Sequence, residues 1–136
     1  MASVNVDEIR SRVEEDWPRI VELIERKIAL KSISAEGITG EQMRRSAEFV
    51  AEELRLVGID AQVAQAHNAD GTPGAWEVIG SRIVDPDAPT VLLYAHHDVQ
   101  PVPDPSVWQT EPFVATQVGD RLFGRGSADD CGGIAI

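Results

Sequence analysis

Residues 92–101 of this chain read LLYAHHDVQP. The apolar run that leads into them, residues 90–94, is short and continuous, and it follows a loop rich in proline and aspartate. Such a run is typical of a central strand that is buried on both faces of a sheet. We therefore expect His96 and Asp98 at the end of a central strand, on the same side of it, with His97 on the opposite side.

The spacing of His96 and Asp98 has two interpretations. A carboxylate beside an imidazole accepts its second N–H, selects its tautomer and raises its basicity as a metal ligand. Both side chains could also bind a metal directly. The alternative is a capped strand end with a surface histidine, and so short a motif does not exclude it.

A second polar motif follows at residues 124–130, which read GRGSADD. Its glycines permit tight turns. The adjacent carboxylates of Asp129 and Asp130 are costly to place together unless a cation neutralises them. The alternative is an ordinary N-cap for a helix that begins at Asp130 or Cys131, and this motif alone does not decide between the two.

Helices are predicted over most of the first 57 residues. Apolar residues recur three and four positions apart over residues 6–32, which predicts a helix with one buried stripe. Pro18 lies inside this pattern and predicts either a kink or the first turn of a second helix. A further helix is expected over residues 41–57, with Thr39 as its cap, Gln42 completing a capping box and Gly58 just beyond its end. The two expected buried stripes are Ile9, Val13, Trp17, Ile20, Ile24 and Ile28, and then Met43, Ala47, Val50, Leu54 and Val57.

From residue 59 the apolar period changes to two, which is typical of strands. We expect strands near residues 59–63 and 76–83, separated by a turn. A later hairpin pairs residues 114–118 with 121–123. Together with a helix that starts in the last residues, this order predicts an α/β fold with a mixed, mostly central sheet flanked by helices.

Composition narrows the possible partners. The net charge is −11 over 136 residues, which argues against nucleic acid or an anionic membrane as a partner. Cys131 is the only cysteine, so neither an intramolecular disulfide nor a thiolate zinc cluster is expected. A reducing, cytoplasmic setting follows as the simplest expectation. We also expect no signal peptide and no membrane anchor, because no long apolar run is present.

The two motifs, with Trp108 and residues 111–113 between them, resemble the co-catalytic zinc aminoacylase and dipeptidase family of M20 type. They are most similar to its carnosinase-like and bacterial dipeptidase branch. The resemblance implies that residues 1–136 form the N-terminal part of a zinc-exopeptidase-like catalytic domain. That domain is then incomplete here, and the lid domain, which also mediates dimerisation, is absent.

The resemblance also implies roles for individual residues. His96 would be a ligand of one zinc ion, Asp98 the catalytic-site carboxylate that orients His96, and Asp129 the bridge between two metal ions. The peptide bond between Asp129 and Asp130 would be cis. The metals are expected to be two zinc ions, with manganese or cobalt as alternatives, and to activate a water that attacks an amide carbonyl. Cys131 stands where the family usually has lysine.

The implied activity is that of a zinc-dependent dipeptidase, with a dipeptide as substrate and a homodimer as the full-length form. An N-acyl-amino-acid deacylase of the same family is one alternative, with an N-acyl amino acid as substrate. A non-catalytic truncated fragment is the other. One histidine and one bridging aspartate do not complete a zinc site, so this chain by itself is not expected to turn over substrate.

Overall fold

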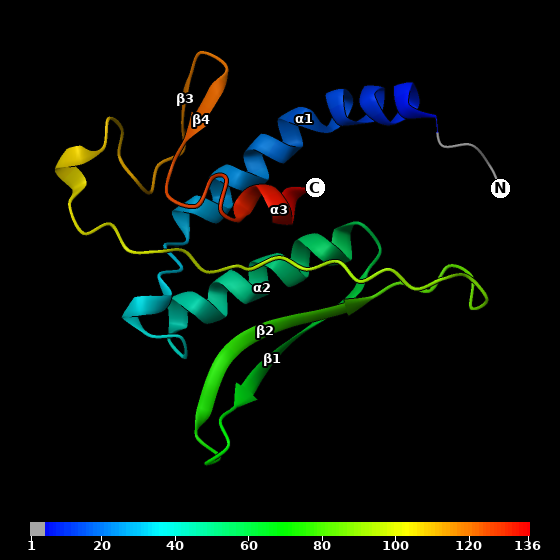
Figure 1. The fold of residues 1–136 in the computed structure, drawn as a ribbon, viewed down its shortest axis with the longest axis horizontal. Helices are drawn as coiled ribbons and strands as arrows, with labels where there is room; N and C mark the ends of the chain where they lie inside the picture. The colour runs from blue at the N-terminus through cyan, green and yellow to red at the C-terminus, as the bar shows by residue number, and fades with distance from the viewer. Residues whose placement is uncertain (1–4) are drawn as a thin grey trace.

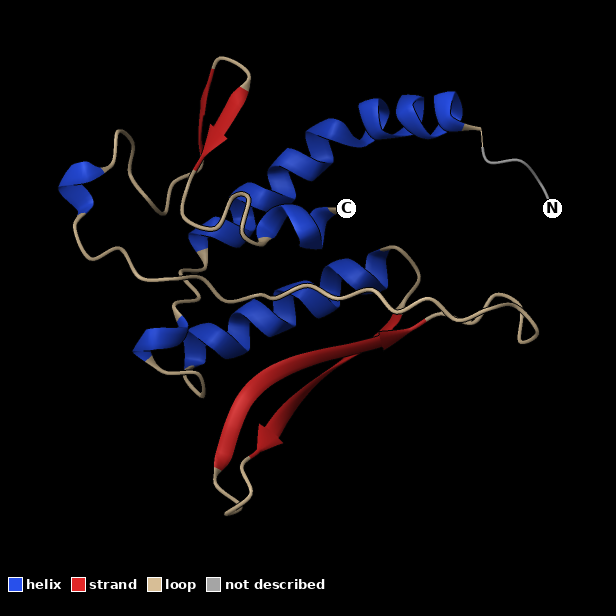
Figure 2. Ribbon diagram, in the orientation of Figure 1, coloured by secondary structure: helices blue, strands red, loops and turns tan. Residues whose placement is uncertain are grey.

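The computed structural model describes residues 5–136. Three helices, two hairpins and long irregular connections make up the fold (Figures 1 and 2). In chain order the elements are α1 (Val6–Ala29), α2 (Glu41–Leu56), β1 (Asp60–His67), β2 (Pro73–Ser81), β3 (Thr116–Val118), β4 (Arg121–Phe123) and α3 (Cys131–Ala135). Single 3-10 turns lie at Ser34–Glu36 and Pro105–Val107.

Helix α1 continues through Pro18 as one helix, so neither a second helix nor a break begins there. Asn5 caps it, because its side chain accepts the backbone N–H groups of the first turn. The predicted apolar stripe is buried only in the C-terminal half of the helix. Ile9, Val13 and Trp17 are between 47% and 57% exposed, since the N-terminal half of α1 extends away from the other described elements (Figure 1).

Helix α2 begins at Glu41 as predicted, but its predicted cap is wrong. Gly40 is the N-cap residue and contributes no side-chain hydrogen bond, so Thr39 and Gln42 form no capping box. Instead, the backbone carbonyl of Thr39 accepts a hydrogen bond from Trp76 Nε1 at 3.1 Å. The helix ends before Gly58, whose φ of +82° is readily adopted by glycine. Of the predicted stripe, Met43, Ala47 and Val50 are buried, Leu54 is partly buried and Val57 is exposed.

Strands β1 and β2 form an antiparallel ribbon, with Asp60 opposite Ser81 and a bulge between Gln65 and His67. Helix α2 covers one face of this ribbon (Figure 1). Strands β3 and β4 form a separate hairpin. The α/β class is therefore confirmed, with two small antiparallel sheets in the described residues in place of the expected central sheet.

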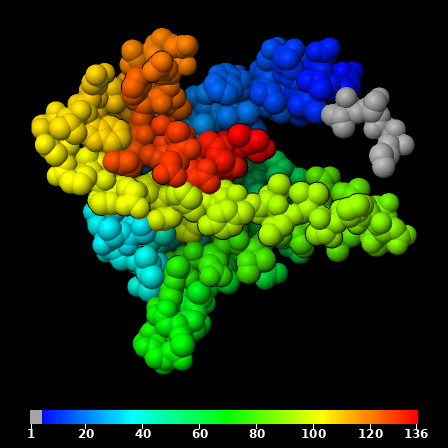
Figure 3. Space-filling view, viewed as in Figure 1, coloured from blue at the N-terminus to red at the C-terminus, as the bar shows by residue number. Residues whose placement is uncertain are grey.

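The central strand predicted over residues 90–94 is not formed. These residues are in no strand, and the side chains from Val91 to Tyr94 are between 77% and 90% exposed. A strand needs a hydrogen-bonded neighbour, and within residues 5–136 no strand lies beside this segment. It crosses the surface as the yellow-green ridge of Figure 3.

Two small clusters of buried apolar residues form around the C-terminal half of α1. Leu23 packs with Phe49 and Val50 of α2. Ile24 and Ile28 pack with Cys131 of α3. Through these contacts α1 packs against both α2 and α3. None of the described helices is long and apolar enough to cross a membrane.

Candidate metal centre

The segment that carries His96 and Asp98 is held against the loop after α1. Val99 donates its backbone N–H to the carbonyl of Ser32 at 2.8 Å, and Val99 forms a parallel bridge with Ile33. Within this segment, Nδ1 of His96 lies 3.0 Å from Oδ1 of Asp98. The predicted pairing of imidazole and carboxylate is therefore present in the structure, although the strand predicted to carry it is not.

The second motif, which lies just before α3, contacts this pair. Nε2 of His96 lies 2.8 Å from Oδ1 of Asp129, and the backbone N–H of His96 donates to Oδ2 of Asp130 at 3.2 Å. The peptide bond between Asp129 and Asp130 is cis, as expected. His96, Asp98 and Asp129 thus lie together, with His96 in the middle.

The neighbouring carboxylates determine the charge of this histidine. Burial lowers the pKa of His96, but the hydrogen bond with Asp129 and the charge of Asp98 outweigh it and raise the pKa above its usual value. For Asp98, burial acts to raise the pKa, and the hydroxyl of Ser34 together with His96 brings it below the usual value. Each ring nitrogen of His96 therefore faces a carboxylate oxygen, Nδ1 that of Asp98 and Nε2 that of Asp129.

His97 points away from these groups into the interior. Its Nδ1 lies 3.0 Å from the hydroxyl of Ser46, and its Nε2 lies 2.9 Å from the carbonyl of Trp76. Burial lowers the pKa of His97. His97 therefore lies on the opposite side of the segment from His96, as predicted, and has a structural role there.

Sequence reasoning missed Lys27, whose ammonium lies directly behind the His96–Asp98 segment. This side chain is 1% exposed and donates to the carbonyl of His97 at 2.7 Å. Its position in the sequence could have revealed it, because Lys27 lies three residues after Ile24 and one before Ile28, on the buried stripe of α1. A lysine on an apolar stripe is unusual, because burying an ammonium without acceptors is costly.

The turn before Asp129 holds the second motif in place. Gly126 has a φ of +86°, and its carbonyl accepts the backbone N–H of Cys131 at 3.0 Å. The thiol of Cys131 is buried, and burial raises its pKa. Such a thiol is a poor nucleophile and a poor metal ligand, since both roles need the thiolate.

The residues present fit part of a metal site. Two typical ligands, an imidazole nitrogen and a carboxylate oxygen, converge on one point, and the second nitrogen of the imidazole is held by a carboxylate. Within residues 5–136, however, no group of three histidine, cysteine or acidic side chains is close enough to hold a metal ion. Four-coordinate zinc needs further ligands.

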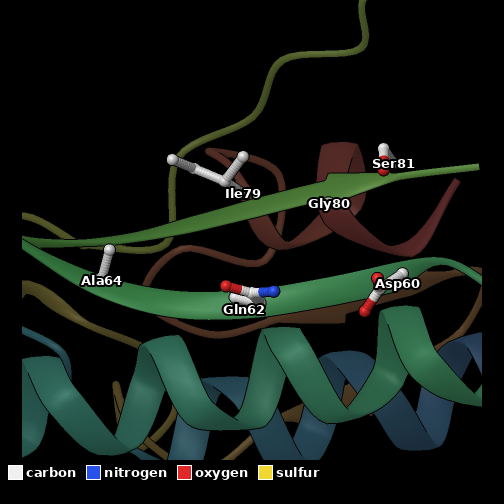
Figure 4. Close-up of a pocket in the computed structure, with 6 residues that line it drawn as sticks. All are labelled: Asp60, Gln62, Ala64, Ile79, Gly80 and Ser81. Atoms are coloured by element: carbon white, nitrogen blue, oxygen red, sulfur yellow. The ribbon is translucent and has the colours of Figure 1, made fainter.

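A shallow pocket lies elsewhere, on the β1–β2 ribbon (Figure 4). It is lined by Asp60, Gln62, Ala64, Ile79, Gly80 and Ser81. None of these residues belongs to the cluster around His96, so this pocket has no part in the candidate centre.

Residues 92–136, which contain both motifs, match the model of Peptidase family M20/M25/M40. The resemblance to the M20 peptidases is confirmed. The chain is 33% identical over 132 residues to the Cys-Gly metallodipeptidase DUG1 of Candida albicans, a match that covers 88% of this chain and 27% of the relative. It is 29% identical over 119 residues to the Beta-Ala-His dipeptidase of Mus musculus, covering 82% of this chain and 24% of the relative.

The fold is shared with a dipeptidase of known structure. Human carnosine dipeptidase 1 superposes with a TM-score of 0.78 at 24% identity, over 96% of this chain and 29% of that chain. The chain therefore spans less than a third of the length of each of these relatives. The name of the first of them, a Cys-Gly metallodipeptidase, indicates a metal cofactor for that enzyme.

Proposed function

We propose that residues 1–136 are the N-terminal part of the catalytic domain of a zinc-dependent dipeptidase. The observation that carries this proposal is the position of His96, which has Asp98 on one ring nitrogen and Asp129 on the other. Sequence matches to a metallodipeptidase and to another dipeptidase, over most of the chain, support it. The lid and dimerisation domain would lie outside these residues, with a homodimer as the full-length form.

In this proposal His96 and Asp129 are metal ligands, and Asp98 fixes the tautomer and direction of the His96 ring. Two zinc ions are proposed, and zinc when bound would lower the pKa of water and polarise the scissile amide. Asp98 holds Nδ1 of His96 so that Nε2 stays aimed at Asp129. The remaining ligands would come from beyond the described cluster. The substrate is proposed to be a dipeptide and the setting cytoplasmic.

Zinc binding tests the assignment. Calorimetry on the chain should detect zinc uptake that Asp129→Ala removes and that Asp98→Asn weakens by about 10- to 100-fold, because partners of a ligating histidine contribute that much. Glu25→Ala, on the exposed face of α1, is the matched control and should bind zinc as the unchanged chain does. Absence of zinc uptake by the unchanged chain would favour the non-catalytic fragment.

Substrate assays belong to the full-length protein. Hydrolysis of dipeptides in preference to N-acyl amino acids would support the dipeptidase proposal. The reverse preference would support the deacylase, which uses the same ligands on another substrate.

A further inference from the structure

The carbonyl of His97 is surrounded by donors from two helices and a loop. Lys27 Nζ donates to it at 2.7 Å, Ser32 Oγ at 2.8 Å and Ser46 Oγ at 2.9 Å. All three donor residues are at most 1% exposed. A carbonyl oxygen has two lone pairs, and here three buried donors share them, so the peptide group after His97 is held from several sides.

Lys27 is the strongest of these donors, because a hydrogen bond from a charged group is shorter and stronger than one from a hydroxyl. Its ammonium also donates to Ser32 Oγ at 2.9 Å. Burial lowers the pKa of Lys27, while Cys131 and Asp98 act in the opposite direction. The ammonium thus donates to the backbone of the candidate centre, and the charge of Asp98 acts on it.

We propose that Lys27 is a positioning residue for the metal-binding segment: its ammonium anchors the carbonyl of His97 and thereby sets the directions of His96 and Asp98. This inference rests on the proposed function. Peptide planarity supplies the mechanism, because fixing the carbonyl of His97 fixes the plane that includes the N–H of Asp98. His96 and Asp98 flank the anchored residue: Nε2 of His96 meets Asp129, and the carboxylate of Asp98 meets Nδ1 of His96.

The position of Cys131 gives this proposal a second test. Cys131 packs against Ile24 and Ile28, on the same side of α1 as Lys27, and stands where the M20 resemblance implies lysine. In this chain the buried ammonium therefore comes from α1 and not from the start of α3. A lysine at position 131 could bring an ammonium to the same place if Lys27 were removed.

The first experiment compares Lys27→Met with Lys31→Met. These are the only lysines of the chain, and Lys31 is exposed, so the pair is a matched control. Lys27→Met should weaken zinc binding by about 10- to 100-fold, as loss of a group that orients a ligand does. In metal-free protein it should also shift the His96 ring nitrogen signals and the carbonyl carbon signal of His97 in NMR spectra. Lys31→Met should change neither quantity.

Folded Lys27→Met protein with unchanged zinc affinity and unchanged histidine signals would overturn the proposal. In the unchanged chain, the ammonium protons of Lys27 should exchange with water more slowly than those of Lys31. Equal exchange would also overturn it, because the ammonium would then not be bound to the carbonyl.

The second experiment combines Lys27→Met with Cys131→Lys. The double variant should recover the His96 signals and most of the zinc affinity. A folded double variant that still resembles Lys27→Met would contradict the proposal. If circular dichroism shows both variants unfolded, Lys27 is required for folding and the proposal is likewise overturned.

A result that contradicts the proposed function can be told apart from one that contradicts the role of Lys27. The unchanged chain would then take up no zinc. The role of Lys27 in setting the direction of His96 would still be decided by the NMR signals of metal-free protein.

Discussion

At the scale of single residues, two adjacent histidines have opposite surroundings. His96 lies between two carboxylates, whereas His97 is enclosed by neutral groups and the Lys27 ammonium. The alternation of side chains along an extended segment separates them, so neighbours in sequence have different chemistry. This separation is what leaves one imidazole available to a metal and commits the other to the interior.

We predict that the two histidines titrate on opposite sides of the ordinary value of about 6.5. The pKa of His96 should lie above it and that of His97 below it, as followed by NMR of the ring signals. Asp129→Asn should lower the pKa of His96 and leave that of His97 unchanged. Equal pKa values for the two rings would contradict the geometry described for them.

The pKa shifts of His96 and His97 make the stability of the fold depend on pH in opposite directions. His97 binds protons more readily in the unfolded chain, so its contribution is fully present above about pH 6.5 and is lost as the pH falls. His96 binds protons more readily in the folded chain. Its contribution is therefore present below that pH and is lost as the pH rises through its raised folded pKa.

At the scale of elements, the turn at Gly126 connects the β3–β4 hairpin to α3 and sets the place of Asp129. A Cβ at Gly126 would lie 2.5 Å from Cγ1 of Val99, which is adjacent to Asp98. The absence of a side chain at this position lets the two motifs approach each other. The glycine is thus required both by its φ and by the close packing of the two segments.

Gly126→Ala should therefore cost more stability than Gly71→Ala. The two glycines have similar φ values, +86° and +83°, but a Cβ at Gly71 would meet nothing within 4 Å. Gly71→Ala should cost about 1–2 kcal/mol for the backbone conformation. Gly126→Ala should add roughly 1–3 kcal/mol of overpacking, measured as the free energy of unfolding in urea. Equal losses of unfolding free energy in the two variants would show that the Val99 side chain moves aside without a measurable cost.

At the scale of the whole molecule, the apolar side chains are distributed unevenly. The two clusters around α1 are small, while Val91 to Tyr94 form a contiguous exposed apolar segment (Figure 3). Burial, and not apolar character, determines what a side chain contributes to stability. Residues on this segment therefore contribute little to the described fold.

Leu92→Ser should change the free energy of unfolding by no more than about 0.5 kcal/mol, as for other exposed positions. Ile28→Ala, in the cluster with Cys131, should cost about 2–5 kcal/mol because it leaves a cavity. Chemical denaturation of the two variants beside the unchanged chain measures both. A large loss for Leu92→Ser would mean that the segment is buried in solution.

Local sequence was sufficient for much of this molecule. Helical periodicity predicted α1 and α2, alternation and turn residues predicted the β1 and β2 strands and the β3–β4 hairpin, and the family resemblance carried by two motifs predicted that His96, Asp98 and Asp129 act together. Each of these depends on neighbours a few residues apart or on residue chemistry. The tertiary structure alone decided that half of the α1 stripe and all of residues 91–94 are exposed, and that Lys27 anchors the carbonyl of His97. Those outcomes depend on which distant segments pack together, and hydrophobicity along the chain does not specify the partner.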